Sequence, residues 1–322
     1  MAKLDEYKQA IVDEYQSTNR NIFVSATAGS GKTFTLCKLA EITPPIKSSI
    51  FLAFNKSIAE ELGQRLPRTV KASTLHSCAL SSLCKAFSLN FALSDSKNFN
   101  LAKEKMNFKG VHSKRIPGMI MKICRLYDLM RFNLVQDDVE AIISLGERYG
   151  EEADENLAKR AIELRMLNKK IADNYFLKGG SGKLPMDFTD MLYYATQYVH
   201  RDDFKQYNVV MLDECQDISP LQMCKTPRGR LIAVGDEKQS IYSFMGSNLD
   251  SLQAIKNAPN TVTLPLSMTY RCAQDIVAEA CKVFPDGIVA APGAVKGFVG
   301  DGTFKDAQEG DFILCRNNAP LV

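Results

Sequence analysis

The sequence predicts an α/β fold built on a parallel β-sheet, and three observations support it. Short apolar runs alternate with helix-like segments over residues 1–77, which implies strands joined by right-handed crossovers. The same alternation resumes after residue 186. A glycine-containing loop follows the first apolar run, at the strand end where open α/β sheets bind ligands. The length of 322 residues suggests two or three domains.

The composition indicates a globular cytoplasmic protein. Hydrophobic residues make up 45% and charged residues 24% of the chain, and no apolar run approaches the roughly 20 residues of a membrane helix. The amino terminus lacks the apolar core of a signal peptide. The nine cysteines contain no C-x2-C pair and are accompanied by three histidines, which disfavours a zinc site and indicates reduced thiols. The net charge of +3 does not by itself indicate nucleic-acid binding.

The first part of the chain predicts alternating helices and strands. Amphipathic segments are assigned to helices, and short apolar runs are assigned to buried strands. The predicted elements are, in order, a helix over 4–15, a strand over 21–25, a helix over 33–39, a strand over 49–54, a helix over 57–62 and a strand over 69–72.

Between residues 78 and 185 the pattern changes and predicts a mostly helical insertion. Long helical periodicities cover 119–129 and 156–172, and a glycine-rich loop follows at 178–183. That loop contains Ser-Gly-Lys, but no strand precedes it and no helix follows it, so it is not a second nucleotide site. Five basic residues of the insertion either form a solvated face or touch duplex DNA: Lys103, Lys105, Lys109, Lys114 and Arg115.

The α/β pattern then returns. Apolar runs predict strands at 208–212, 230–234 and 261–264, and the first two end in acidic residues. The remaining segment predicts a helix over 273–283 and a strand over 312–314, which is too little for a complete second α/β domain.

The loop over residues 26–33 has the sequence of a phosphate-binding loop. Its glycines let consecutive backbone N–H groups turn inward around phosphate oxygens, and the helix that begins near Lys32 adds the positive end of its dipole. We expect Lys32 to reach the β- and γ-phosphates and the Thr33 hydroxyl to bind Mg²⁺. The residues of this segment assigned to the nucleotide are Ala28, Gly29, Ser30, Gly31, Lys32, Thr33 and Phe34.

Two acids follow the apolar strand over 208–212. We expect Asp213 to hold Mg²⁺ through water and Glu214 to accept a proton from the attacking water. The alternative interpretation is a strand followed by a solvated acidic turn.

A third polar cluster makes a family resemblance specific. Asp-Glu-Cys-Gln-Asp at 213–217 and Gly-Asp-Glu-Lys-Gln-Ser-Ile-Tyr-Ser-Phe at 235–244 resemble motifs II and III of UvrD-like, superfamily 1A DNA helicases. Segments 51–56, 73–77 and 270–271 then resemble motifs Ia, Ib and IV, in family order. The likeness is greatest to phage or F-box-type DNA helicases.

The resemblance implies a domain organisation. Residues 1–77 and 186–266 would form a RecA-like motor domain, 1A, with residues 78–185 as the helical insertion domain, 1B. Residues 267–322 would begin a second RecA-like domain, 2A. Motifs V and VI do not occur before Val322, so we expect this chain to bind nucleotide and to hydrolyse it poorly.

Several roles at the nucleotide are implied by the resemblance alone. Gln239 would sense the γ-phosphate and couple it to DNA contacts. Tyr270 would stack on adenine, and Arg271 would reach the γ-phosphate as an arginine finger. Gln9 is the candidate adenine reader of the amino-terminal Q motif, but Lys8 competes for that register.

The resemblance also implies DNA contacts. Phe54 and Phe244 would stack on bases, which suits a motor that grips DNA without reading its sequence; ordinary core aromatics are the alternative. His76 has either a structural role or a contact with a backbone phosphate. Asn55 and Tyr242 complete the predicted DNA-binding set.

The leading hypothesis is an ATP-dependent DNA helicase or translocase with ATP and Mg²⁺ as its cofactors. It would move 3′ to 5′ on single-stranded DNA and act at junctions of single- and double-stranded DNA, in the cytoplasm of a bacterial or phage-infected cell. The sequence does not identify partner proteins in replication or repair. A non-unwinding, nucleotide-dependent DNA-binding or regulatory protein is the alternative from another class, and a 5′ to 3′ motor is the alternative within the superfamily.

Overall fold

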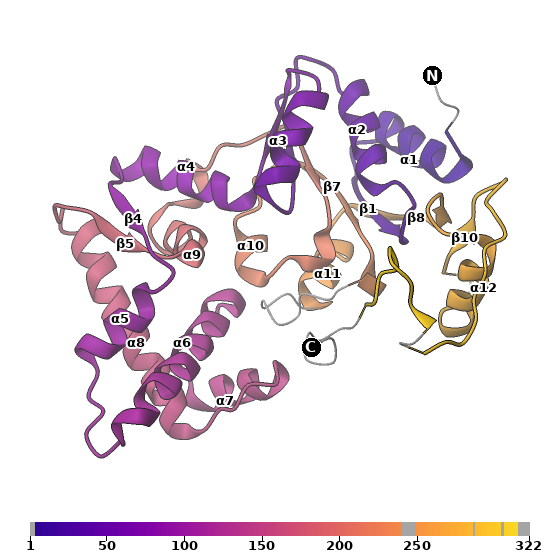
Figure 1. Ribbon diagram of the computed structural model, residues 1–322. Coiled ribbons are helices and arrows are strands. Elements are labelled where there is room, and N and C mark those ends of the chain that lie inside the picture. The colour runs from indigo at the N-terminus through magenta and orange to yellow at the C-terminus, as the bar shows by residue number, and fades with distance from the viewer. Residues whose placement is uncertain (1–3, 240–248, 286, 304–305, 315–322) are drawn as a thin grey trace.

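The computed structural model describes residues 4–239, 249–285, 287–303 and 306–314 (Figure 1). Its centre is a six-stranded sheet in the order β3-β2-β6-β7-β1-β8, with every neighbouring pair parallel. The strands are β1 Asn21–Ala26, β2 Ser49–Leu52, β3 Val70–Ser73, β6 Val209–Leu212, β7 Arg230–Gly235 and β8 Thr261–Leu266. The predicted α/β fold with a parallel sheet is confirmed.

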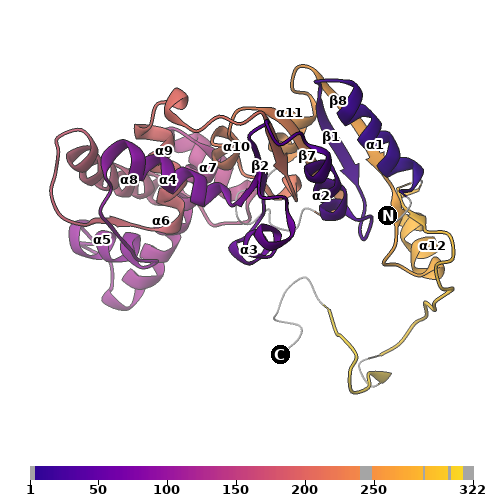
Figure 2. The ribbon, with the colours of Figure 1, turned by 90° about the horizontal axis from the view of Figure 1, so that it is seen from above.

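Helices cover both faces of this sheet. Successive strand residues point to opposite faces, so apolar residues at consecutive positions need a covering layer on each side. Phe23 packs into one core cluster and Val24 into the other. The Val24 side is covered by α1 Glu6–Ser17, α2 Lys32–Ile42 and α3 Lys56–Arg65. The Phe23 side is covered by α4 Leu75–Phe87, α9 Phe188–Tyr198, α10 Pro220–Cys224 and α11 Leu249–Lys256. Figure 2 shows α1 and α2 beside β1 and β8.

The predicted helical insertion is present at the far side of the sheet from α12 (Figure 1). Its helices are α5 Lys97–Lys105, α6 Ile116–Asn133, α7 Val139–Arg148 and α8 Glu155–Phe176. They share a separate core that includes Ile123 and Leu164. A short parallel pair, β4 Phe91–Leu93 and β5 Leu184–Met186, joins the segments by which the chain enters and leaves the helical insertion.

The boundary predicted at residue 78 falls inside α4. Leu75, Ala79 and Leu83 of that helix all pack into the core of the central sheet. The end of α8 reaches the same core through Ala172 and Phe176. The two regions are therefore joined by continuous packing and not by a bare linker.

After β8 the chain forms β9 Met268–Thr269, α12 Gln274–Val283 and β10 Val289–Ala290, and β10 pairs with β9. The predicted strand over 312–314 is wrong. Phe312 and Leu314 are 90% and 87% exposed, and no neighbouring strand pairs with them in the described part of the chain. None of the described helices is long and apolar enough to cross a membrane.

Candidate nucleotide-binding site

The phosphate loop connects β1 to α2, as predicted. Gly29 and Gly31 have positive φ angles of 70° and 87°, a conformation that side-chain-bearing residues rarely adopt. The first turn of α2 has Gly31 as its cap and no side chain bonded to its N–H groups. These donors and the positive end of the helix dipole therefore face the loop, which suits an anionic ligand.

The loop lines a cavity of about 310 Å³. Most of the predicted nucleotide-binding residues meet there. Its lining consists of Gly29, Ser30, Gly31, Lys32, Thr33, Phe34, Glu214, Tyr270 and Arg271. Ala28 belongs to the loop but not to this lining, and Ser30 is buried, with its hydroxyl donating to the Thr27 carbonyl at 2.8 Å.

Two contacts join the phosphate loop to the acids that follow β6. Lys32 Nζ lies 2.6 Å from Glu214 Oε2, and the Thr33 hydroxyl donates to Asp213 Oδ2 at 2.6 Å. Only β7 lies between β1 and β6 in the sheet. Side chains that follow β1 and β6 can therefore meet at the carboxyl edge of the sheet. The four groups form one compact polar site.

The electrostatics of this site favour a bound cation. Burial raises the pKa of Asp213, although the Thr33 hydroxyl lowers it. Burial and the neighbouring Glu214 raise the pKa of Asp217 to about 6. Asp217 Oδ1 is a buried oxygen without a hydrogen-bond partner among the described residues. A hydroxyl and carboxylate oxygens are the ligands that Mg²⁺ prefers, so the residues present fit this ion.

Gln216 links this acidic cluster to the end of β7, a role that sequence reasoning missed. Its amide donates to Glu214 at 2.8 Å, and its carbonyl accepts from the backbone N–H of Asp236 at 3.0 Å. Gln239 in turn donates to Asp236 Oδ2 at 2.6 Å and does not line the cavity. A continuous series of hydrogen bonds therefore connects Glu214 to Gln239 through Gln216 and Asp236.

The segment after β9 closes the cavity from the other side. The Tyr270 backbone N–H donates to the Gly29 carbonyl at 2.9 Å. A Cβ added to Gly29 would lie 2.5 Å from Arg271 Cβ, so this approach requires glycine. Tyr270 is 57% exposed, and its hydroxyl donates to Asp5 Oδ2 at 2.6 Å.

The two candidates for the base reader lie in different surroundings. Gln9 is exposed and donates to Asp13 at 2.8 Å. Lys8 is 5% exposed and lies against the phosphate loop. Spacing to the buried residues Ile11 and Tyr15 of α1 is the sequence signal that places Lys8 on the inner face.

Comparison with known proteins decides the family. The model of the UvrD/REP helicase N-terminal domain matches residues 15–260. The chain belongs to the UvrD/REP helicase family.

Full-length relatives are DNA helicases by name. The chain is 26% identical over 296 residues to F-box DNA helicase protein 1 of Schizosaccharomyces pombe, covering 86% of this chain and 32% of that protein. It is 23% identical over 302 residues to F-box DNA helicase 1 of Gallus gallus, covering 87% and 28%. With ATP-dependent DNA helicase UvrD1 of Mycobacterium leprae, identity is 23% over 320 residues, covering 86% and 39%. The chain thus spans 28–39% of the length of these helicases.

Three of the residues predicted to contact DNA follow the carboxyl ends of β2 and β3, which are neighbours in the sheet: Phe54, Asn55 and His76. Phe54 is 38% exposed, and Asn55 caps α3 by accepting from the Ile58 backbone N–H at 2.9 Å. Tyr242 and Phe244 lie outside the described residues.

His76 stacks on Phe188, an aromatic that sequence reasoning did not assign. Their ring centroids are 4.0 Å apart with an interplanar angle of 26°. Burial lowers the pKa of His76 to about 4, so the imidazole is neutral at pH 7. Phe188 is 55% exposed and begins α9 immediately after its cap, Asp187. An aromatic directly after a capping aspartate was the signal available in the sequence.

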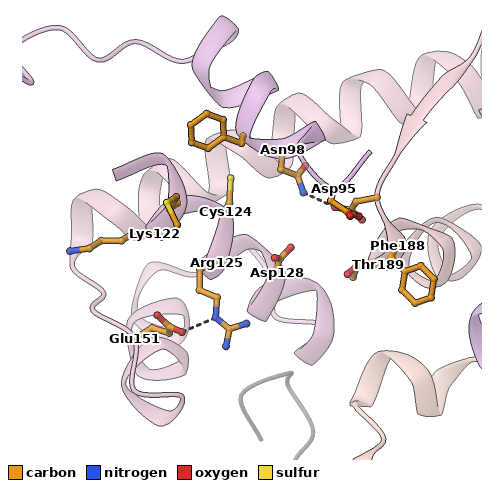
Figure 3. A pocket seen from close by; sticks show the side chains of 12 residues that line it. Asp95, Asn98, Lys122, Cys124, Arg125, Asp128, Glu151, Phe188 and Thr189 are labelled. Carbon is orange, nitrogen blue, oxygen red and sulfur yellow. Dashed lines mark hydrogen bonds and ion pairs between the residues drawn. The ribbon is translucent and has the colours of Figure 1, made fainter. Parts of the chain in front are cut away.

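A larger cavity of about 610 Å³ borders Phe188 (Figure 3). Arg125 and Asp128 of the insertion lie on one side of it, with Phe188 and Thr189 on the other. The cavity therefore lies between the insertion and α9, separate from the phosphate loop.

Proposed function

We propose that this chain is the nucleotide-binding portion of an ATP-dependent DNA helicase or translocase. The observation that carries the proposal is the pair of contacts Lys32–Glu214 and Thr33–Asp213 at the phosphate loop. A loop lysine, a loop hydroxyl and two strand-end acids are the groups that hold the phosphates and metal of a nucleoside triphosphate in P-loop enzymes. Membership of a DNA helicase family supports the same conclusion.

Each of these groups has a distinct part in the proposed reaction. The loop N–H groups and Lys32 bind the phosphates, while the Thr33 hydroxyl and Asp213 bind Mg²⁺. Bound Mg²⁺ would neutralise charge that develops on the phosphate oxygens. Lys32 leaves Glu214 when it binds phosphate, which frees that carboxylate to take a proton from the attacking water.

Arg271 and Gln239 complete the proposed mechanism. Arg271 lines the cavity and supplies positive charge to the γ-phosphate. Gln239, through Asp236 and Gln216, connects the acids at the phosphate to the segment that leads towards Tyr242 and Phe244.

The proposed track is single-stranded DNA, with movement from 3′ to 5′. Phe54 and Phe188 present exposed aromatic surface for base stacking, which is tolerant of sequence. Asn55 and His76 lie beside them at the same edge of the sheet. Because His76 is neutral at pH 7, it contributes as a stacking partner and not as a cation for phosphate.

The test is nucleotide binding followed by strand separation. The purified protein should bind a fluorescent ATP analogue only with Mg²⁺, and Lys32→Ala should weaken that binding at least about tenfold because a charge-assisted contact is lost. In a complete motor that also contains motifs V and VI, duplexes with a 3′ or a 5′ single-stranded tail then report unwinding and its direction. DNA-stimulated ATP hydrolysis without strand separation would favour the non-unwinding DNA-binding protein, and unaltered nucleotide binding by Lys32→Ala would overturn the assignment of the loop.

A further inference from the structure

A buried ion pair at the start of α1 lies against the phosphate loop, next to two residues that line the nucleotide cavity, Gly31 and Tyr270. The side chains of Lys8 and Asp5 are 6% and 8% exposed, and their charged groups are in direct contact. Lys8 Cε lies 3.4 Å from the position of a Cβ added to Gly31. The Lys8 ammonium also lies 4.3 Å from the centroid of the Tyr270 ring. Lys8 therefore occupies the space between the phosphate loop and the aromatic ring proposed to stack on the base.

The hydrogen-bonding capacity of Asp5 is largely taken up inside the protein. Its Oδ1 accepts from the Lys8 backbone N–H at 2.8 Å, and its Oδ2 accepts from the Tyr270 hydroxyl at 2.6 Å and from the Lys8 ammonium. An ammonium has three N–H donors and no acceptor. The group that can bind a nucleobase here is therefore the Lys8 ammonium, a hydrogen-bond donor that Asp5 holds in place.

Donor and acceptor chemistry then determines which bases can be read. A glutamine amide pairs with adenine because it donates to N7 and accepts from the N6 amine, whereas lysine donates to the N7 and O6 acceptors of guanine. Adenine also has the N7 acceptor, but neither pyrimidine has it. An ammonium at this position consequently recognises what the two purines share.

Building on the proposed function, we propose that Lys8, held by Asp5, makes this a purine site that binds GTP as well as ATP and disfavours pyrimidine nucleotides. The ammonium now lies over the Tyr270 ring, and its flexible four-carbon stem lets it move to the edge of a base that stacks there. Asp5 keeps its hydrogen bond to the Tyr270 hydroxyl and so holds the ring and the ammonium at the same base.

The first experiment uses the unaltered protein. Competition against a fluorescent ATP analogue with Mg²⁺ is measured for ATP, GTP, CTP and 7-deaza-ATP, which lacks the N7 acceptor. We expect ATP and GTP to compete within about threefold of each other, and CTP and 7-deaza-ATP to compete about tenfold more weakly. Rejection of GTP by tenfold or more, or equal competition by ATP and 7-deaza-ATP, overturns the inference.

Variants then assign the effect to Lys8. Lys8→Gln should make ATP bind about tenfold more tightly than GTP, because the amide now accepts from the adenine amine. Lys8→Ala should bring CTP to within about threefold of ATP. Lys85→Gln, which alters an exposed lysine of α4, is the matched control and should keep the wild-type pattern. Melting temperatures verify that every variant is folded.

The remaining outcomes are also decisive. Equal weakening of ATP, GTP and CTP by Lys8→Ala would show that Lys8 binds phosphate and would overturn the proposed base contact. Loss of base selectivity in Gln9→Ala would return the reading role to Gln9. Absence of any Mg²⁺-dependent nucleotide binding by the wild-type protein would instead reject the proposed function, so the two failures are distinguishable.

Discussion

Glu214 is the residue at which backbone strain and proposed chemistry coincide. Its φ of 51° lies in the left-handed region, which a residue with a Cβ occupies at a cost of about 1–3 kcal/mol. The Glu214 carboxylate contacts both Lys32 and Gln216. The strained backbone therefore lies directly after β6, at the residue whose carboxylate makes both of these contacts.

The role of this carboxylate is testable by Glu214→Gln. In a complete motor that also contains motifs V and VI, we expect the variant to bind ATP with an affinity close to wild type but to lose at least about 99% of hydrolysis, because general-base catalysis contributes roughly 100- to 10,000-fold. Fluorescent-nucleotide titration measures the first quantity, and phosphate release measures the second. If binding is lost together with hydrolysis, Glu214 is structural or binds the metal.

Asp217 should make stability depend on pH. Burial and Glu214 raise its pKa to about 6 in the folded protein, above the value of about 3.9 for an unfolded chain. The folded state therefore binds the proton more tightly, so the destabilising effect of this carboxyl is absent below about pH 4, grows between about pH 4 and 6, and is fully present above about pH 6. Asp217→Asn should raise the melting temperature at pH 7, and its advantage should shrink as the pH falls to 5. A constant difference across this range would contradict the raised pKa.

Among the elements, α6 and α9 are joined by a buried charge cluster. Arg131 of α6 donates to Asp187 at 2.7 and 2.8 Å and to Asp190 at 2.7 Å. The same two aspartates form the capping box of α9. Burial raises the pKa of Asp187, but the Arg131 guanidinium outweighs it and brings that pKa to about 2. The start of α9, including Phe188, is thus fixed by a residue of the insertion.

Removal of this arginine should be costly. Arg131→Met removes the guanidinium that two buried carboxylates share. Asp190 then keeps only its ion pair with Lys97, and no other cation among the described residues is in direct contact with Asp187. We expect a loss of about 3–5 kcal/mol in the free energy of unfolding. Arg125→Met is the matched control on the same helix, because the pair of Arg125 with Glu151 is partly exposed and should be worth at most about 1 kcal/mol. Urea unfolding compares them, and equal losses would show that the buried cluster has no special weight.

Apolar runs were sufficient to predict the strands of the central sheet, since β6 and β7 are buried by their own composition. The capping box at Asp187 and Asp190 escaped notice because the spacing of two acids does not reveal a buried arginine 56 residues away in sequence. The failed strand at 312–314 has the opposite cause. Its apolar residues satisfy the pattern, but a strand also needs a neighbour.

At the scale of the molecule, the phosphate loop and Phe54, which is proposed to stack on DNA, both follow the carboxyl ends of strands of the same central sheet. The sequence predicted the glycine loop and the acids after β6 at strand ends, where open parallel sheets bind ligands. The motifs alone left the choice between Lys8 and Gln9 open and gave Phe188 no role. The positions of Phe188 and Lys8 depend on the stacking of His76 and on the inner face of α1, which are tertiary contacts.

Phe188, which is proposed to stack on DNA bases, provides a test of the proposed track. Phe188→Ala should weaken binding of single-stranded DNA by roughly 1–3 kcal/mol, the value of one base–aromatic stack. Nucleotide affinity without DNA should be unchanged, since Phe188 does not line the nucleotide cavity. Phe298→Ala removes another exposed phenylalanine and serves as the control. Fluorescence anisotropy with labelled oligonucleotides measures both, and equal affinities for Phe188→Ala and wild type would exclude this residue from the track.

The strand order determines when β1 can pair with its neighbours during synthesis of the nascent chain. β1 lies between β7 and β8, and Asn21 at its start bonds to Pro259, which is 238 residues further along the chain. At a synthesis rate of about 5–20 residues per second, β1 waits roughly 10–50 seconds on the ribosome before both of its neighbours have emerged. The helical insertion can collapse earlier, because its contacts are local. β1 is therefore synthesised before the other strands of its sheet, but it can complete its pairing only after most of them have been synthesised. The phosphate loop that follows β1 can fold fully only once β8 has left the ribosome.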